Sequence, residues 1–161
     1  EALRLGINQS KGDYVTIFNI DFWDIGFLKS SIMLLKTNEY DFIVGSKLID
    51  NNLDKRGILR KFISIIFNQI LKLFFGFKGT DTHGLKFFTR QKVAFLMKDC
   101  HAKYWLFDTE LVLLAKHLRL RIIEIPTACI ESRPSTTGVI KKIPKTLMDL
   151  PSLLYLWFLL F

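Results

Sequence analysis

The chain has 161 residues, of which half are hydrophobic and 14% are aromatic, and this composition excludes an intrinsically disordered protein. Its 23 Lys and Arg against 15 Asp and Glu give a net charge of +8, which favours anionic partners such as phosphates or acidic lipid. The basic residues are interleaved with bulky aliphatic side chains, which argues against a nucleic-acid-binding surface.

The ends of the chain and its cysteines carry further expectations. Cys100 and Cys129 are far apart and lack metal-like spacing, so we expect no disulfide framework and a reducing compartment. The chain begins without Met, inside an apparent helix, and it ends on an apolar run. We therefore expect a fragment of a longer protein.

The first half of the chain predicts alternating helices and strands. The expected elements are a helix over 1–12, a strand over 13–20, a helix over 27–36 and a buried strand over 40–46. The first strand is almost continuously apolar, which is typical of a strand covered on both faces in a parallel sheet. Leu28, Ile32 and Leu35 are expected to point inward from the second helix. This β-α-β order predicts an α/β fold with right-handed crossovers.

The second half predicts a long helix over 56–78, a short strand over 85–89, a helix over 90–97, a helix over 107–118 capped by Asp108, and a strand over 121–126. The long helix is apolar over most of its circumference and carries only basic charges. We interpret it as a membrane-interface helix, with a core helix or a dimer contact as the alternative.

Oxygen-bearing side chains gather at the end of the first strand. Asn19, Asp21 and Asp24 lie where that strand ends, and ligands of open α/β sheets gather at such ends. A hard divalent cation prefers oxygen ligands, so this group is a candidate metal site. Alternatively, Asp21 or Asp24 caps the helix that follows.

Seven segments occur in an order that resembles the family 2 glycosyltransferases of the dolichyl-phosphate mannose synthase and polyprenyl-phosphate glycosyltransferase type. The segments are Ser10–Asp21, Tyr40–Lys47, Leu59–Ser64, Asp81–Phe88, Phe107–Leu111, Ile122–Pro126 and Glu131–Gly138. The resemblance implies a partial A-type glycosyltransferase fold, which is Rossmann-like, with a mostly parallel sheet and amphipathic membrane-interface helices. It implies a domain over 1–144 that lacks its N-terminal nucleotide-binding part, and a tail over 145–161 that is interfacial or begins a transmembrane segment.

The resemblance also implies roles for particular residues. Asn19 and Asp21 occupy the place of the DxD motif, which holds Mg²⁺ or Mn²⁺ on the donor diphosphate, and the uncharged Asn19 weakens that site. Catalytic roles fall to Asp21, Asp81 and Glu110. Phosphate-binding roles fall to Lys47, Arg56, Arg60, Arg133 and Ser135.

A lipid phosphate acceptor is consistent with these basic residues. A phosphate monoester is largely ionised near neutral pH and needs no general base, but cations must offset its repulsion from an anionic donor. The resemblance, together with these basic residues, implies inverting transfer of a hexose from a nucleotide diphosphate sugar to a polyprenyl (dolichyl-type) phosphate, at the cytoplasmic face of the membrane. The isolated chain is expected to be inactive.

Two alternatives remain open from the sequence. One is transfer to a polysaccharide or protein hydroxyl, with Asp81 or Glu110 as the general base. The other is a degenerate, non-catalytic, membrane-associated protein that binds a sugar nucleotide.

Overall fold

The computed structural model describes residues 2–19, 23–50, 52–102, 106–128, 151–152 and 154–158. Its strands form one sheet in the order β1 (Tyr14–Ile17), β3 (Lys86–Thr89), β2 (Phe42–Ser46) and β4 (Ile122–Pro126). β2 and β4 are parallel, whereas β3 runs antiparallel to both β1 and β2. The predicted α/β class is confirmed, but the sheet is mixed rather than mostly parallel, because β3 lies between β1 and β2 and runs opposite to both.

The interpretation of β1 as a strand covered on both faces is wrong. Among the described strands it lies at an edge of the sheet, and its residues alternate between exposed and partly buried. Val15 and Ile17 pack against the core, while Tyr14 and Thr16 are exposed. β2 is the strand that is buried along its whole length, as its sequence predicted.

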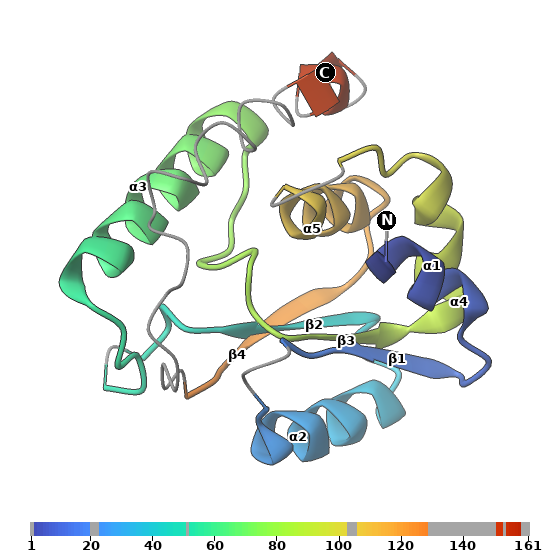
Figure 1. The fold of residues 1–161 in the computed structure, drawn as a ribbon. Coiled ribbons are helices and arrows are strands. Elements are labelled where there is room, and N and C mark those ends of the chain that lie inside the picture. The colour runs from blue at the N-terminus through green and yellow to red at the C-terminus, as the bar shows by residue number, and fades with distance from the viewer. Residues whose placement is uncertain are drawn as a thin grey trace.

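Helices cover both faces of the sheet (Figure 1). α2 (Ile25–Lys36) covers one face, where Phe27 and Leu35 pack with Ile43 of β2. The other face carries α1 (Ala2–Gln9), α4 (Arg90–Ala94), which continues into a 3-10 turn (Phe95–Lys98), and α5 (Phe107–His117). Phe42 and Val44 of β2 pack into that larger core with most of the apolar residues of α5.

Two helix starts bear on the sequence predictions. Asp24 caps α2, since its Oδ1 accepts a hydrogen bond from the Phe27 amide at 2.8 Å. The capping alternative is therefore confirmed for Asp24. Asp108 is not the cap of α5, because Leu106 holds that position and Asp108 lies within the first turn. Its side chain is thereby available for a different contact.

α3 (Ile58–Phe75) lies beside the sheet rather than across one of its faces (Figure 1). Its buried residues are Asn68, Leu71 and Phe75, and it ends at Gly76, whose φ of +56° is in the left-handed region. Nine of its bulky apolar side chains are exposed: Ile58, Leu59, Phe62, Ile63, Ile65, Ile66, Ile70, Leu73 and Phe74. No helix within the described residues is long and apolar enough to cross a membrane.

The described part of the apolar tail is helical at 151–152 and 154–158. Leu156 is buried in the larger core, and the ring of Tyr155 lies 5.2 Å from that of His101.

Candidate functional site

The topology brings several polar segments to one edge of the sheet. β1, β2 and β4 run in the same direction, so their carboxyl ends meet at the edge where β3 begins. Asn19 follows β1, Lys47 follows β2, and the turn over 80–84 leads into β3. Ligands of open α/β sheets bind beyond this edge, which makes it the candidate site.

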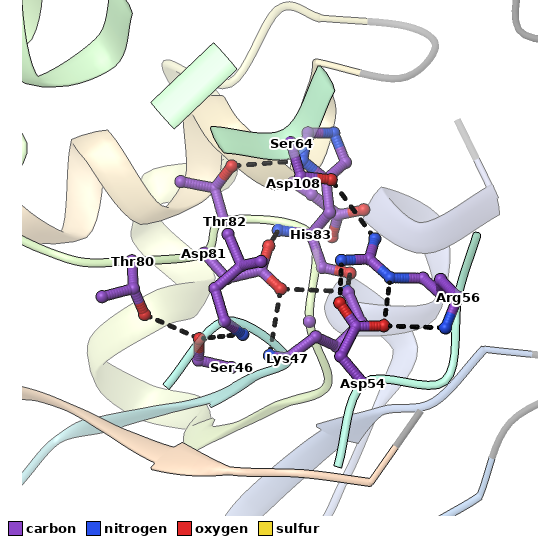
Figure 2. Close-up of polar contacts among 12 residues, drawn as sticks. Ser46, Lys47, Asp54, Arg56, Ser64, Thr80, Asp81, Thr82, His83 and Asp108 are labelled. Atoms are coloured by element: carbon purple, nitrogen blue, oxygen red, sulfur yellow. Dashed lines mark hydrogen bonds and ion pairs between the residues drawn. The ribbon is translucent and has the colours of Figure 1, made fainter. Parts of the chain in front are cut away.

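Lys47 and Asp81 form the centre of this site (Figure 2). The Lys47 ammonium lies 3.0 Å from Asp81 Oδ2, and it also donates to the His83 carbonyl oxygen at 3.1 Å. Both side chains are buried. Burial would raise the pKa of Asp81, but the charge of Lys47 and the hydrogen bonds from Lys47 and the His83 amide together outweigh it, so the pKa lies below its ordinary value. Asp81 is therefore an ionised carboxylate near neutral pH.

His83 connects this pair to α3. Its backbone amide donates to Asp81 Oδ1 at 2.8 Å, and its Nδ1 lies 3.2 Å from the Thr82 hydroxyl. The imidazole meets the ring of Phe67 on α3 edge-on, with ring centres 5.4 Å apart. Burial lowers the pKa of His83 despite the opposing charges of Asp108 and Asp81, so the ring is neutral near pH 7.

A second ion pair lies beside the first. The Lys86 ammonium is 2.6 Å from Asp108 Oδ1 and donates to the Gly84 carbonyl oxygen at 2.9 Å. Lys86 is fully buried, whereas Asp108 keeps some exposure. Sequence analysis assigned Asp108 to a helix cap and so missed this contact. The available signal was that the segment Phe107–Leu111 contains Asp108 as well as the candidate Glu110.

Glu110 points to another part of the molecule. Its Oε2 accepts hydrogen bonds from the Ala102 amide at 2.7 Å and from the Cys100 thiol at 3.1 Å. Glu110 is fully buried, and burial together with its charge raises the pKa of Cys100. The structure therefore places Glu110 against the segment that precedes α5, and not beside Asp81.

The predicted phosphate-binding residues are only partly brought together. Arg56 forms a bidentate pair with Asp54, at 2.9 and 2.8 Å, and donates to the Ser64 hydroxyl at 3.2 Å (Figure 2). Burial opposes ionisation of Asp54, but Arg56 brings the net pKa below its ordinary value. Arg60 is half-buried in the first turn of α3. Asp21, Arg133 and Ser135 lie outside the described residues.

The metal prediction rests on the end of β1. Asn19 is exposed there, so its amide oxygen is accessible to a cation. The carboxylate of Asp24 is engaged as a helix cap. Among the described residues, no group of three or more His, Cys, Asp or Glu gathers in a way that would hold a metal.

Close backbone packing fixes the turn before β3. The Gly45 amide donates to the Leu85 carbonyl oxygen at 2.7 Å. A Cβ atom on Gly84 would lie 1.5 Å from the Gly45 carbonyl oxygen, so position 84 accepts only glycine without a backbone shift. The glycine of the segment Asp81–Phe88 thus lets the turn that carries Asp81 and His83 lie directly against the end of β2.

Comparison with known proteins agrees with the resemblance found in the sequence. No protein-family model matches the chain. Dolichyl-phosphate beta-glucosyltransferase ALG5D of Trichomonas vaginalis is 31% identical over 153 residues, covering 87% of this chain and 46% of the relative. The human dolichyl-phosphate beta-glucosyltransferase is 29% identical over 134 residues, covering 77% and 41%. Glycosyltransferase AglD of Haloferax volcanii is 27% identical over 127 residues, covering 78% and 20%.

These similarities confirm the predicted relation to the family 2 glycosyltransferases. Within that class, the chain is related to the dolichyl-phosphate beta-glucosyltransferases. It spans about half the length of the curated relatives that it matches first.

Proposed function

We propose that this chain is part of a hexosyltransferase that moves glucose from a nucleotide diphosphate sugar to a polyprenyl phosphate of the dolichyl type, with inversion. The main support for this proposal is the similarity of the chain to several proteins named dolichyl-phosphate beta-glucosyltransferases. The buried Lys47–Asp81 and Lys86–Asp108 pairs support it, because they place charged groups at the carboxyl edge of the sheet, where ligands of open α/β sheets bind.

The charges of the site suit two anionic reactants. A lipid monophosphate is its own nucleophile near neutral pH, so the protein must orient it and offset its repulsion from the donor. Lys47 and Lys86 supply buried positive charge at the site, and Asp81 and Asp108 fix their positions. In this proposal Asp81 orients Lys47 and the bound sugar, and Arg56, Arg60, Arg133 and Ser135 contribute to phosphate binding.

A divalent ion, Mg²⁺ or Mn²⁺, belongs to the proposal through Asn19 and Asp21. When bound, such an ion would neutralise charge on the donor diphosphate. Asn19 would contribute an uncharged oxygen and Asp21 a carboxylate, so we propose a weaker metal site than two carboxylates would make.

α3 supports a membrane-surface acceptor. Its exposed apolar side chains occur with Arg60, Lys61 and Lys72, and the helix contains no acidic residue. This combination matches the boundary of an anionic lipid layer. We propose that the protein acts at the cytoplasmic membrane face, where α3 brings the site to a lipid-borne phosphate.

The test is a transfer assay with the protein as its gene encodes it. Labelled nucleotide diphosphate glucose is supplied with dolichyl phosphate, and label is measured in the organic phase. The expected result is an acid-labile glucosyl lipid whose formation falls strongly in Asp21→Ala. Transfer to a polysaccharide hydroxyl, with none to the lipid, would overturn the acceptor. Donor binding without transfer to either acceptor would instead identify a non-catalytic binding protein.

A further inference from the structure

Glu124, in the middle of β4, holds the turn that carries Asp81. Both of its carboxylate oxygens lie 2.9 Å from the Thr80 amide nitrogen, and Oε2 lies 2.6 Å from the Thr80 hydroxyl. The Asp81 amide approaches Oε1 at 3.4 Å. Glu124 thus forms hydrogen bonds with Thr80, the residue before Asp81, and with the amide of Asp81 itself.

The contacts continue to the other member of the pair. The Thr80 hydroxyl lies 2.6 Å from the Ser46 hydroxyl, and Ser46 Oγ accepts from the Leu48 amide at 3.1 Å (Figure 2). Ser46 and Leu48 flank Lys47, whose own amide donates to Asp81 Oδ2 at 3.3 Å. The carboxylate of Glu124 is therefore linked to the backbone next to Asp81 directly, and to the backbone next to Lys47 through the hydroxyls of Thr80 and Ser46.

The charge of Glu124 determines the direction of this chain of hydrogen bonds. An ionised carboxylate only accepts, so the Thr80 hydroxyl donates its single proton to Glu124. The Thr80 oxygen then accepts from Ser46, and Ser46 in turn accepts from the Leu48 amide. Each of the two hydroxyls is thus used both as a donor and as an acceptor, which directs the Ser46 hydroxyl proton toward Thr80.

We propose that Glu124 is a positioning residue for the transfer reaction, acting through Thr80 and Ser46 to hold Lys47 against Asp81. The role of Glu124 in transfer rests on the proposed function, whereas the positioning of Lys47 by Glu124 does not. Gly79 allows the approach, because a Cβ atom there would lie 2.1 Å from Glu124 Oε1. Glutamine at position 124 would keep the shape but would turn an NH₂ group toward the Thr80 amide, where only an acceptor fits.

The first test measures the exposure of Lys47 without using activity. The full protein is treated briefly with acetic anhydride, and acetylation of Lys47 is compared with that of the exposed Lys72 by mass spectrometry. The ratio is expected to rise about tenfold in Glu124→Gln and in Thr80→Val, as loss of one hydrogen bond to a charged group implies. Thr80→Ser keeps the hydroxyl and should leave the ratio unchanged.

Asp41→Asn is the control for general destabilisation. Asp41 is a buried carboxylate that pairs with Arg121 and Lys92 at the opposite end of the same strands. Its loss should lower the melting temperature while the Lys47 ratio stays at the wild-type value. An unchanged ratio in Glu124→Gln, or an equal rise in Asp41→Asn, would overturn the positioning of Lys47 by Glu124.

The second test is a cycle of kcat/KM values for transfer, with Glu124→Gln, Asp81→Asn and the double variant. If Glu124 acts through Asp81, Glu124→Gln should lower transfer strongly in the wild type and by less than about twofold beside Asp81→Asn. If the two substitutions lower kcat/KM by factors that multiply in the double variant, Glu124 does not act on transfer through Asp81, and the proposed positioning role is overturned. A wild-type protein that transfers nothing would refute the proposed function, and the acetylation ratio would still decide the geometric inference.

Discussion

Asp108 and Glu110 are two residues apart in the first turns of α5, yet their carboxylates serve opposite sides of the helix. Asp108 lies 2.6 Å from the Lys86 ammonium at the candidate site, whereas Glu110 lies 2.7 Å from the Ala102 amide in the core. Two residues correspond to about 200° of helical rotation, so one segment supplies a carboxylate to each location. This separation lets their roles be tested independently.

We expect Glu110→Gln to affect folding more than chemistry. Glutamine keeps an acceptor for the Ala102 amide and the Cys100 thiol but loses the charge in both bonds, which should cost about 1–3 kcal/mol of unfolding free energy. Urea unfolding measures that loss. Transfer by the remaining folded protein should stay within about twofold of wild type. A stable but inactive Glu110→Gln protein would instead support the catalytic role inferred from the family resemblance.

Asp81→Asn should be destabilising and should abolish most transfer. It leaves the buried Lys47 ammonium without its counter-charge, and breaking a buried pair in this way costs about 3–5 kcal/mol. Adding Lys47→Met removes the uncompensated charge, so the double variant should regain stability. Transfer should not return, because the positive charge is then missing. Recovery of transfer in the double variant would show that the pair is only structural.

Much of the fold could be predicted from the sequence because its signals are local. The apolar run of β2, the turn residues and the helical spacing of α2 and α5 each specify an element without reference to distant residues. The edge position of β1 could not be predicted in this way. It depends on β3 pairing with both β1 and β2, and strand order is a property of contacts between remote segments.

The position of the candidate site at the end of β1 could be inferred from the residues, but Lys47 and Asp81 could be selected only through the family resemblance. That resemblance selected Lys47 and Asp81, which the fold brings to 3.0 Å across 34 positions of sequence. It did not select Asp108 or Glu124, because a helix-start acid and a single acid in a strand have commoner explanations. Their roles depend on which way each side chain points, and this is fixed by packing in three dimensions.

His83 should make stability depend on mildly acidic pH. Its folded pKa is lowered by burial, so the unfolded chain, with a pKa near 6.5, binds the proton more readily. Stability is therefore fully present above about pH 6.5 and falls as the pH drops from there toward the folded pKa. Urea unfolding at pH 7.5 and 5.5 should show a loss that is smaller in His83→Gln. The Asp81 contribution is lost only at lower pH, below the ordinary carboxyl pKa of about 3.9. An equal loss in both proteins would assign the pH effect to other groups.

Asn19→Asp should strengthen the proposed metal site. Replacing the exposed amide that follows β1 by a carboxylate adds a charged oxygen ligand two residues before Asp21 in the sequence. The Mn²⁺ concentration that gives half-maximal transfer should fall, and direct titration of Mn²⁺ by electron paramagnetic resonance should show tighter binding. Asp13→Asn, at the exposed residue before β1, changes the net charge by one unit in the other direction and should leave Mn²⁺ binding unchanged if the effect is local to position 19. Unaltered Mn²⁺ binding in Asn19→Asp would remove Asn19 from the ligand set.

The exposed face of α3 should govern binding to lipid. Ile58 and Leu73 are 86% and 80% exposed, so aspartate at either position should change the unfolding free energy by no more than about 0.5 kcal/mol. Each change removes apolar area that would enter the lipid boundary and adds a charge that anionic headgroups repel. Cosedimentation with vesicles that contain phosphatidylserine should therefore weaken about tenfold or more for each variant, because burial of one such side chain is worth about 1.5–3 kcal/mol.

Met33→Asp on α2 alters an equally apolar side chain, 70% exposed, on a different helix and should bind like wild type. If all three variants lose binding equally, net charge rather than α3 explains the attraction, and binding that survives in Ile58→Asp and Leu73→Asp would place the membrane contact elsewhere on the protein.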